Sequence, residues 1–123
     1  MSDLDADEVL NGHLQELRRG TVVMAALAAL ETERHGYQLI DELAASGISV
    51  AGDTLYPLLR RLERQGLLTS EWNTDESRPR KFYATTPAGT AVLTALVAEW
   101  RRLDAAIHAI TVPNDITEPE EAP

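Results

Sequence analysis

The stretch GDTLYPLLRRLERQGLL, residues 52–68, decides the fold class of this chain. At 100° per residue, its leucines fall in one arc of a helical wheel: Leu55, Leu58, Leu59 and Leu62. The opposite arc carries Asp53, Pro57, Arg60 and Arg64, and Tyr56 and Arg61 lie on the flanks. The stretch therefore predicts a helix from about residue 52 to 65, ended by Gly66, with a leucine face inward and an arginine face outward.

Helical periodicity precedes this stretch. A helix from about 4 to 17 is predicted by Leu10, Leu14 and Leu17, although Gly12 interrupts it. A second, from near Thr21 to about residue 31, has Thr21 as its cap. A third, from about 35 to 45, is predicted to bury Tyr37, Ile40 and Leu43, and Ser46–Gly47 ends it.

A hairpin and a long helix follow the arginine helix. The runs LLTSEW (67–72) and KFYATT (81–86) alternate like strands and are joined by NTDESRPR (73–80), which predicts a hairpin with an arginine-bearing tip. Thr86 then provides a cap and Pro87 a first helical residue for a helix reaching about residue 110. The predicted fold class is mainly α with a small β-hairpin.

The last helix carries an apolar seam with spacings of 3, 4, 3, 4 and 3 residues: Leu93, Leu96, Trp100, Leu103, Ile107 and Ile110. Such spacing is typical of a helix that packs against another helix, here a second copy of the chain. The alternative is that the stripe packs only on its own domain.

Charge is segregated along the 123 residues. All 11 lysines and arginines lie between Arg18 and Arg102, and this segment has a net charge of +1, although the whole chain carries −9. The flanking segments, 1–17 and 103–123, each hold five acids and no base. The acidic total therefore does not exclude a nucleic-acid partner.

The chemistry of an enzyme is not predicted. The chain has no cysteine, its three histidines (His13, His35 and His108) stand apart, and no phosphate loop or nucleophile motif occurs. His35 is interpreted as a helix-start residue and not as a metal ligand. We expect no metal, no cofactor and no membrane span, and the lack of cysteine fits a cytoplasmic location.

The order of the elements is that of a winged helix-turn-helix, in which one helix enters the major groove of double-stranded DNA. Arginine suits this role because its planar fork binds phosphate or the guanine edge bidentately. The predicted DNA-binding residues are Arg18, Arg19, Thr54, Tyr56, Arg60, Arg61, Arg64, Arg78, Arg80 and Lys81.

Residues 17–110 resemble the PadR-like winged-helix transcriptional regulators. The segments that carry the resemblance are LRRGT (17–21), HGYQLIDEL (35–43), GDTLYPLLRRLERQGLL (52–68), SEW (70–72), RPRKFYATTPAG (78–89) and EWRRLDAAI (99–107). The single long C-terminal helix is similar to that of the subfamily that includes the multidrug-sensing regulator LmrR. The chain departs from the family at Ala51-Gly52-Asp53, where a capping hydroxyl is missing and an acid stands at the helix start.

The resemblance implies a homodimer in which the last helix packs on the partner's first helix. Dimerisation is then assigned to Leu10, Leu14, Leu17 and the seam from Leu93 to Ile110. It also implies that Trp100 flanks a site for a planar aromatic effector; the alternative is that Trp100 is a large core residue of the seam.

The expected organisation is an N-terminal segment (1–17), a winged-helix domain (18–86), a dimerisation helix (87–111) and a disordered acidic tail (112–123). The predicted function is a homodimeric repressor, released by a small aromatic effector bound at the dimer interface. The alternative is a dimeric protein-interaction module without specific DNA binding.

Overall fold

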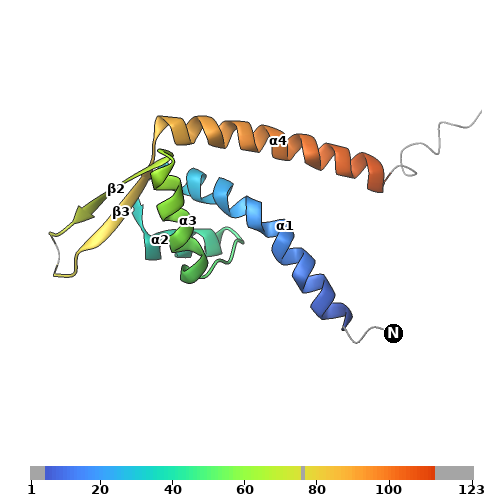
Figure 1. The fold of residues 1–123 in the computed structure, drawn as a ribbon, viewed down its shortest axis with the longest axis horizontal. Helices are drawn as coiled ribbons and strands as arrows, with labels where there is room; N and C mark the ends of the chain where they lie inside the picture. Colours follow the sequence, from blue (N-terminus) through green and yellow to red (C-terminus); the bar gives the residue numbers. More distant parts are fainter. Residues whose placement is uncertain (1–4, 76, 113–123) are drawn as a thin grey trace, which may run out of the picture. The chain divides into compact units, whose positions relative to one another are not determined.

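The computed structural model describes residues 5–75 and 77–112. Its elements follow in the order α1 (Ala6–Ala29), β1 (Arg34–His35), α2 (Gly36–Ala45), α3 (Gly52–Arg64), β2 (Leu68–Asn73), β3 (Arg80–Thr85) and α4 (Pro87–Thr111) (Figure 1). The chain divides into two units, residues 1–93 and 94–123, so that α4 begins in the first and ends in the second. The predicted class, mainly helical with a small antiparallel sheet, is confirmed.

The first helix differs from the prediction. One continuous helix of 24 residues, α1, replaces the two expected at 4–17 and 21–31. Asp5 caps it, with its carboxylate accepting from the backbone N–H of Asp7 at 3.1 Å. The Thr21 hydroxyl donates to the Arg18 carbonyl at 2.7 Å and therefore starts no new helix. Gly20 lowers helix stability by only about 1 kcal/mol relative to alanine, which does not break a helix whose later turns are anchored in the core.

The core is built largely from leucines, and the arc predicted for the arginine helix is confirmed. The buried cluster includes Leu27 and Leu30 at the end of α1, Leu39 and Leu43 of α2, and Leu55, Leu58, Leu59 and Leu62 of α3. Burial of a leucine side chain contributes about 1.5–3 kcal/mol relative to its exposed state. Packing on this cluster therefore fixes which face of α3 is turned outward.

The prediction that Tyr37 is buried is wrong. Its side chain is 63% exposed, whereas Leu43 is buried and Ile40 partly buried as expected. Leu39 and Leu43, four residues apart, define the inward face of α2. Tyr37 lies about 200° around the helix from Leu39 and therefore faces away from the core.

The sheet has the order β1-β3-β2 with antiparallel pairing, and it confirms the predicted hairpin. In the hairpin, Trp72 lies directly opposite Lys81 and Asn73 opposite Arg80. The two-residue strand β1, in which His35 lies opposite Phe82, was not predicted. It joins the start of α2 to the hairpin.

Thr86 and Gly89 join α4 to the base of the hairpin. The Thr86 hydroxyl accepts from the Gly89 N–H at 3.1 Å and donates to the Gly66 carbonyl at 2.7 Å, and the Thr86 N–H donates to the Leu67 carbonyl at 3.0 Å. The predicted cap and the proline at the first helical position are thus confirmed. Gly89 is buried against Leu67, and a Cβ at this position would overlap the Leu67 carbonyl oxygen.

The predicted acidic tail is residues 112–123, of which residues 113–123 lie outside the described residues, as do residues 1–4. Among the helices that are described, none combines the length and the apolar character needed to cross a membrane.

Candidate nucleic-acid interface

The outer face of α3 is cationic. Arg60, Arg61 and Arg64 are exposed, and Thr54 is exposed near the start of the helix. The four leucines of the opposite face are buried, so the guanidinium groups cannot turn inward without breaking the core. The helix therefore presents three permanent positive charges to solvent.

The start of α3 lacks a side-chain cap, as expected from Ala51. The backbone N–H groups of Thr54 and Leu55 both donate to the Ala51 carbonyl, at 3.1 and 2.9 Å. Asp53 lies in the first turn of α3, where its negative charge interacts favourably with the positive N-terminal end of the helix dipole.

Tyr56 connects α3 to the start of α2. Its ring lies directly on Gly36, where a Cβ would overlap it, and also approaches Gly52. Burial raises the pKa of the Tyr56 hydroxyl above its usual value, and the neighbouring Tyr37 and Tyr83 add to the rise. The hydroxyl is therefore protonated at neutral pH and is able to donate a hydrogen bond.

Lys81 of the hairpin is held by α3. Its ammonium lies 3.7 Å from Glu63 Oε1 and 5.6 Å from the centre of the Tyr83 ring. The Ser70 hydroxyl donates to Glu63 Oε2 at 2.6 Å. Burial, and then the charge of Glu63, raises the pKa of Tyr83. Glu63 thus fastens both strands of the hairpin to α3 and offsets the charge of Lys81.

Arg80 is held by the start of α2. Its Nη1 lies 2.7 Å from His35 Nε2, and His35 Nδ1 accepts from the Gln38 N–H at 3.3 Å in a capping box. His35 is therefore a helix-start residue, as predicted. Of the three hairpin cations proposed for DNA, only Arg78 is exposed, whereas Arg80 and Lys81 are half-buried.

The remaining predicted DNA contacts lie on α1. Arg18 and Arg19 are both exposed, and Arg19 forms an ion pair with Glu16 at 2.8 Å. Both pairing groups are largely solvated, so the pair adds little to stability and leaves Arg19 available to another anion.

The residues predicted for dimerisation are mostly exposed within one chain. On α1, Leu10 is 55% and Leu17 73% exposed, and Leu14 is half-buried. Along α4, Leu93 and Leu96 are half-buried, whereas Trp100, Leu103, Ile107 and Ile110 are exposed by 46–71%.

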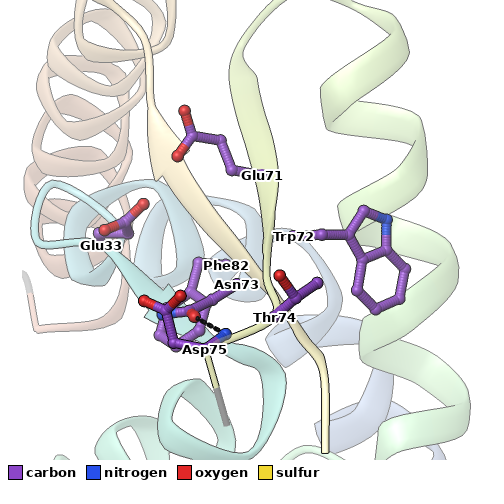
Figure 2. A pocket seen from close by; sticks show the side chains of 7 residues that line it. All are labelled: Glu33, Glu71, Trp72, Asn73, Thr74, Asp75 and Phe82. Atoms are coloured by element: carbon purple, nitrogen blue, oxygen red, sulfur yellow. Dashed lines mark hydrogen bonds between the residues drawn. The ribbon is translucent and has the colours of Figure 1, made fainter.

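The hairpin carries two pockets of different charge. One, of about 320 Å³, is lined by the acids Glu33, Glu71 and Asp75 together with Trp72, Asn73, Thr74 and Phe82 (Figure 2). The Asp75 N–H donates to Asn73 Oδ1 at 2.9 Å there. No group of three or more histidines, cysteines or acids among residues 5–75 and 77–112 is arranged to hold a metal ion.

The other pocket, of about 300 Å³, lies between the start of α2, α3 and the hairpin, and is called the aromatic cleft below. Its lining includes Tyr37, Tyr56, Trp72, Arg78 and Lys81. Sequence reasoning missed Tyr37 and Trp72. The sequence around them carries no aromatic–basic alternation, because Tyr37 is flanked by Gly36 and Gln38 and Trp72 by Glu71 and Asn73.

Comparison with known proteins places this arrangement in a family. The model of the "Transcriptional regulator PadR-like family" matches residues 23–95. The transcriptional regulator Rv3488 of Mycobacterium tuberculosis is 44% identical over 82 residues, which are 66% of this chain and 77% of that protein.

Solved structures agree. A PadR family transcriptional regulator from Eggerthella lenta is 45% identical, with a TM-score of 0.82 over 85% of this chain and 94% of that one. A PadR-like transcription factor from Bacteroides fragilis is 29% identical, with a TM-score of 0.68 over 81% of this chain and 99% of that one.

Proposed function

Because this chain belongs to the PadR-like family of transcriptional regulators, we propose that it is a homodimeric repressor that binds a specific DNA sequence. The observation that carries the proposal is the division of α3 into a buried leucine face and an exposed arginine face, beside a hairpin with an exposed arginine. A helix of this kind enters the major groove, and the hairpin follows the adjacent backbone.

Each predicted DNA-binding residue has a proposed role. Tyr56, Arg60 and Arg61 contact the major groove or its walls, and Thr54 and Arg64 contact nearby phosphates. On the hairpin, Arg78, Arg80 and Lys81 contact the phosphate backbone or a narrow minor groove. Arg18 and Arg19 of α1 add phosphate contacts.

Dimerisation accounts for the exposed apolar residues. Trp100, Leu103, Ile107 and Ile110 follow the spacing of a helix–helix seam and are exposed in a single chain. Their proposed occupant is a second copy, with Leu10, Leu14 and Leu17 of its α1. Such a dimer presents two copies of α3 to successive major grooves about 34–36 Å apart, which requires a near-palindromic operator.

Replacement of Arg60 or Arg61 tests the DNA-binding proposal. After selection of bound duplexes from a random pool, each alanine variant is expected to lose about 1–3 kcal/mol on the selected operator. Arg101→Ala, which removes an exposed arginine from α4, is the charge-matched control and should retain affinity. An equal loss on every duplex identifies a phosphate contact only. If the wild-type protein selects no duplex, the proposal fails and a dimeric protein-interaction module is favoured.

An effector site at Trp100 completes the proposal. We infer that a planar aromatic ligand stacks on the half-exposed indole of Trp100 at the dimer interface and releases DNA by favouring one spacing of the two α3 helices. A Trp72→Phe variant leaves Trp100 as the single tryptophan. Titration of this variant with planar cationic dyes should change its emission, and unchanged emission contradicts the effector site.

A further inference from the structure

We propose that the aromatic cleft receives one sugar–phosphate segment of the bound duplex, with the deoxyribose against the indole of Trp72 and the phosphate near Arg78 and the Tyr37 hydroxyl. This inference rests on the proposed function and adds a contact of a different chemical kind. Trp72 and Tyr37 then contribute apolar contact to DNA binding, whereas the arginines of α3 contribute charge and hydrogen bonds.

Exposure is the first argument. Trp72 is 64% and Tyr37 63% exposed, and both line the same cleft. Two large aromatic side chains that are both exposed and line the same cleft form an apolar patch, and such patches are typical of binding surfaces. The Tyr37 ring stands edge-on to His35, with centroids 6.4 Å apart, which limits its orientation.

The second argument is the positive charge of the residues that line the cleft, because it favours an anionic ligand. Arg78 is exposed at this cleft, and the half-buried Arg80 and Lys81 also line it. The other pocket, which Trp72 also borders, is lined by the acids Glu33, Glu71 and Asp75 and by no arginine or lysine. A polyanion is therefore attracted to the pocket that holds the cations and repelled from the pocket that holds the acids.

The position of Trp72 in the sheet is the third argument. Trp72 is opposite Lys81, and Ser70 is opposite Tyr83, so these side chains share one face of the hairpin. The Ser70–Glu63 hydrogen bond shows that this face looks toward α3. Figure 2 shows the indole directed away from Glu33 and Asp75. A DNA strand that passes between α3 and the hairpin therefore meets Trp72.

The same observations restrict the kind of contact. Lys81 is engaged by Glu63 and supplies little free charge, so the apolar surface of Trp72 is the largest contact available beside Arg78. Contacts to the sugar and phosphate of a duplex carry no direct sequence information. The cleft is accordingly expected to raise affinity on all duplexes by a similar factor and to leave the preferred operator unchanged.

Affinity measurements on substituted proteins test the inference. Trp72→Ala is expected to weaken binding to the selected operator about tenfold, which corresponds to the loss of about 50–60 Å² of buried apolar surface, and Trp72→Phe is expected to weaken it less. Thr69→Ala, on the same strand but the other face, is the matched control and should bind as wild type. The slope of log K against log salt should stay unchanged in Trp72→Ala but become shallower by about 0.9 in Arg78→Ala, which removes one phosphate contact.

Tryptophan fluorescence gives a second readout that does not depend on folding of the alanine variant. DNA should shift the emission of the wild-type protein, and Trp72→Phe, in which only Trp100 remains, should lose that shift while still binding. Wild-type affinity in Trp72→Ala, or an unchanged emission shift in Trp72→Phe, overturns the inference and leaves the proposed function standing. Quenching of Trp72 by a small planar anion that persists unchanged while DNA is bound assigns the cleft to that ligand and also overturns the inference. If the wild-type protein binds no duplex, both proposals fail.

Discussion

Replacement of Gly89 by alanine should destabilise the protein, although alanine is the better helix former. Gly89 lies in the first turn of α4, and its missing Cβ leaves room for the Leu67 carbonyl oxygen and the methyl group of Thr85. The carbonyl is backbone and cannot rotate away. The added methyl must therefore move α4 away from the base of the hairpin, against the hydrogen bonds that Thr86 makes to Gly66 and Leu67.

The expected magnitude follows from two opposing terms. Forcing one extra methyl into a packed site costs about 1–3 kcal/mol, and contact with rigid backbone places Gly89 near the upper value. The higher helix propensity of alanine compared with glycine offsets about 1 kcal/mol of this cost. The net loss of about 2 kcal/mol should lower the melting temperature by roughly 5–10 °C for a domain of this size.

Thermal denaturation followed by circular dichroism measures this change, with Gly20→Ala as the control. Gly20 is also helical, but its added Cβ would meet no atom within 4 Å. This variant should be stabilised by up to about 1 kcal/mol. If Gly89→Ala also melts at a higher temperature than wild type, the close approach of α4 to Leu67 is refuted.

Two further predictions concern the hairpin. Burial raises the pKa of Tyr83 in the folded state, so its contribution to stability is complete below the usual tyrosine pKa of about 10 and is lost as the pH rises through the folded value. The midpoint of urea unfolding should therefore be flat from neutral pH to about 9 and fall above about 10, and Tyr83→Phe should reduce that fall; a midpoint that rises with alkaline pH contradicts this. In Glu63→Gln, the ammonium of Lys81 is released to bind phosphate, and the salt dependence of DNA binding should steepen by about 0.9. Because the side chains of Lys81 and Glu63 are each one-third exposed, Glu63→Gln should reduce the free energy of unfolding by less than about 1 kcal/mol. An unchanged slope in salt titrations of DNA binding would show that Lys81 does not reach DNA.

Patterns within single elements were predictable from the sequence. The leucine arc of α3 and the hairpin that follows it depend on local periodicity, which a wheel or an alternation displays directly. The cap at Thr86 was also predictable because Thr-Pro is specific for a helix start. Family membership followed from combinations of these same segments.

Features that depend on contacts across the chain were not predictable. Thr21 after Gly20 has the residues of a helix start, but its hydroxyl bonds within a continuous helix because the later turns of α1 are anchored in the core. Tyr37 is apolar enough to fit a core, and its outward position follows from the packing of Leu39 and Leu43. The engagement of Lys81 by Glu63 joins residues far apart in the sequence, so the loss of its free charge was not visible before the fold was known.

The unbroken course of α1 has a mechanical consequence. At 1.5 Å per residue, its 24 residues form a rod of about 36 Å, with Leu10 near one end and Leu27 locked among the core leucines at the other. Because α1 has no break, it moves as one rigid body, and a rotation of about 5° about its core end displaces the other end by roughly 3 Å. A partner that binds the exposed leucines near the start of α1 can therefore tilt the helix, and with it the domain that carries the arginines of α3.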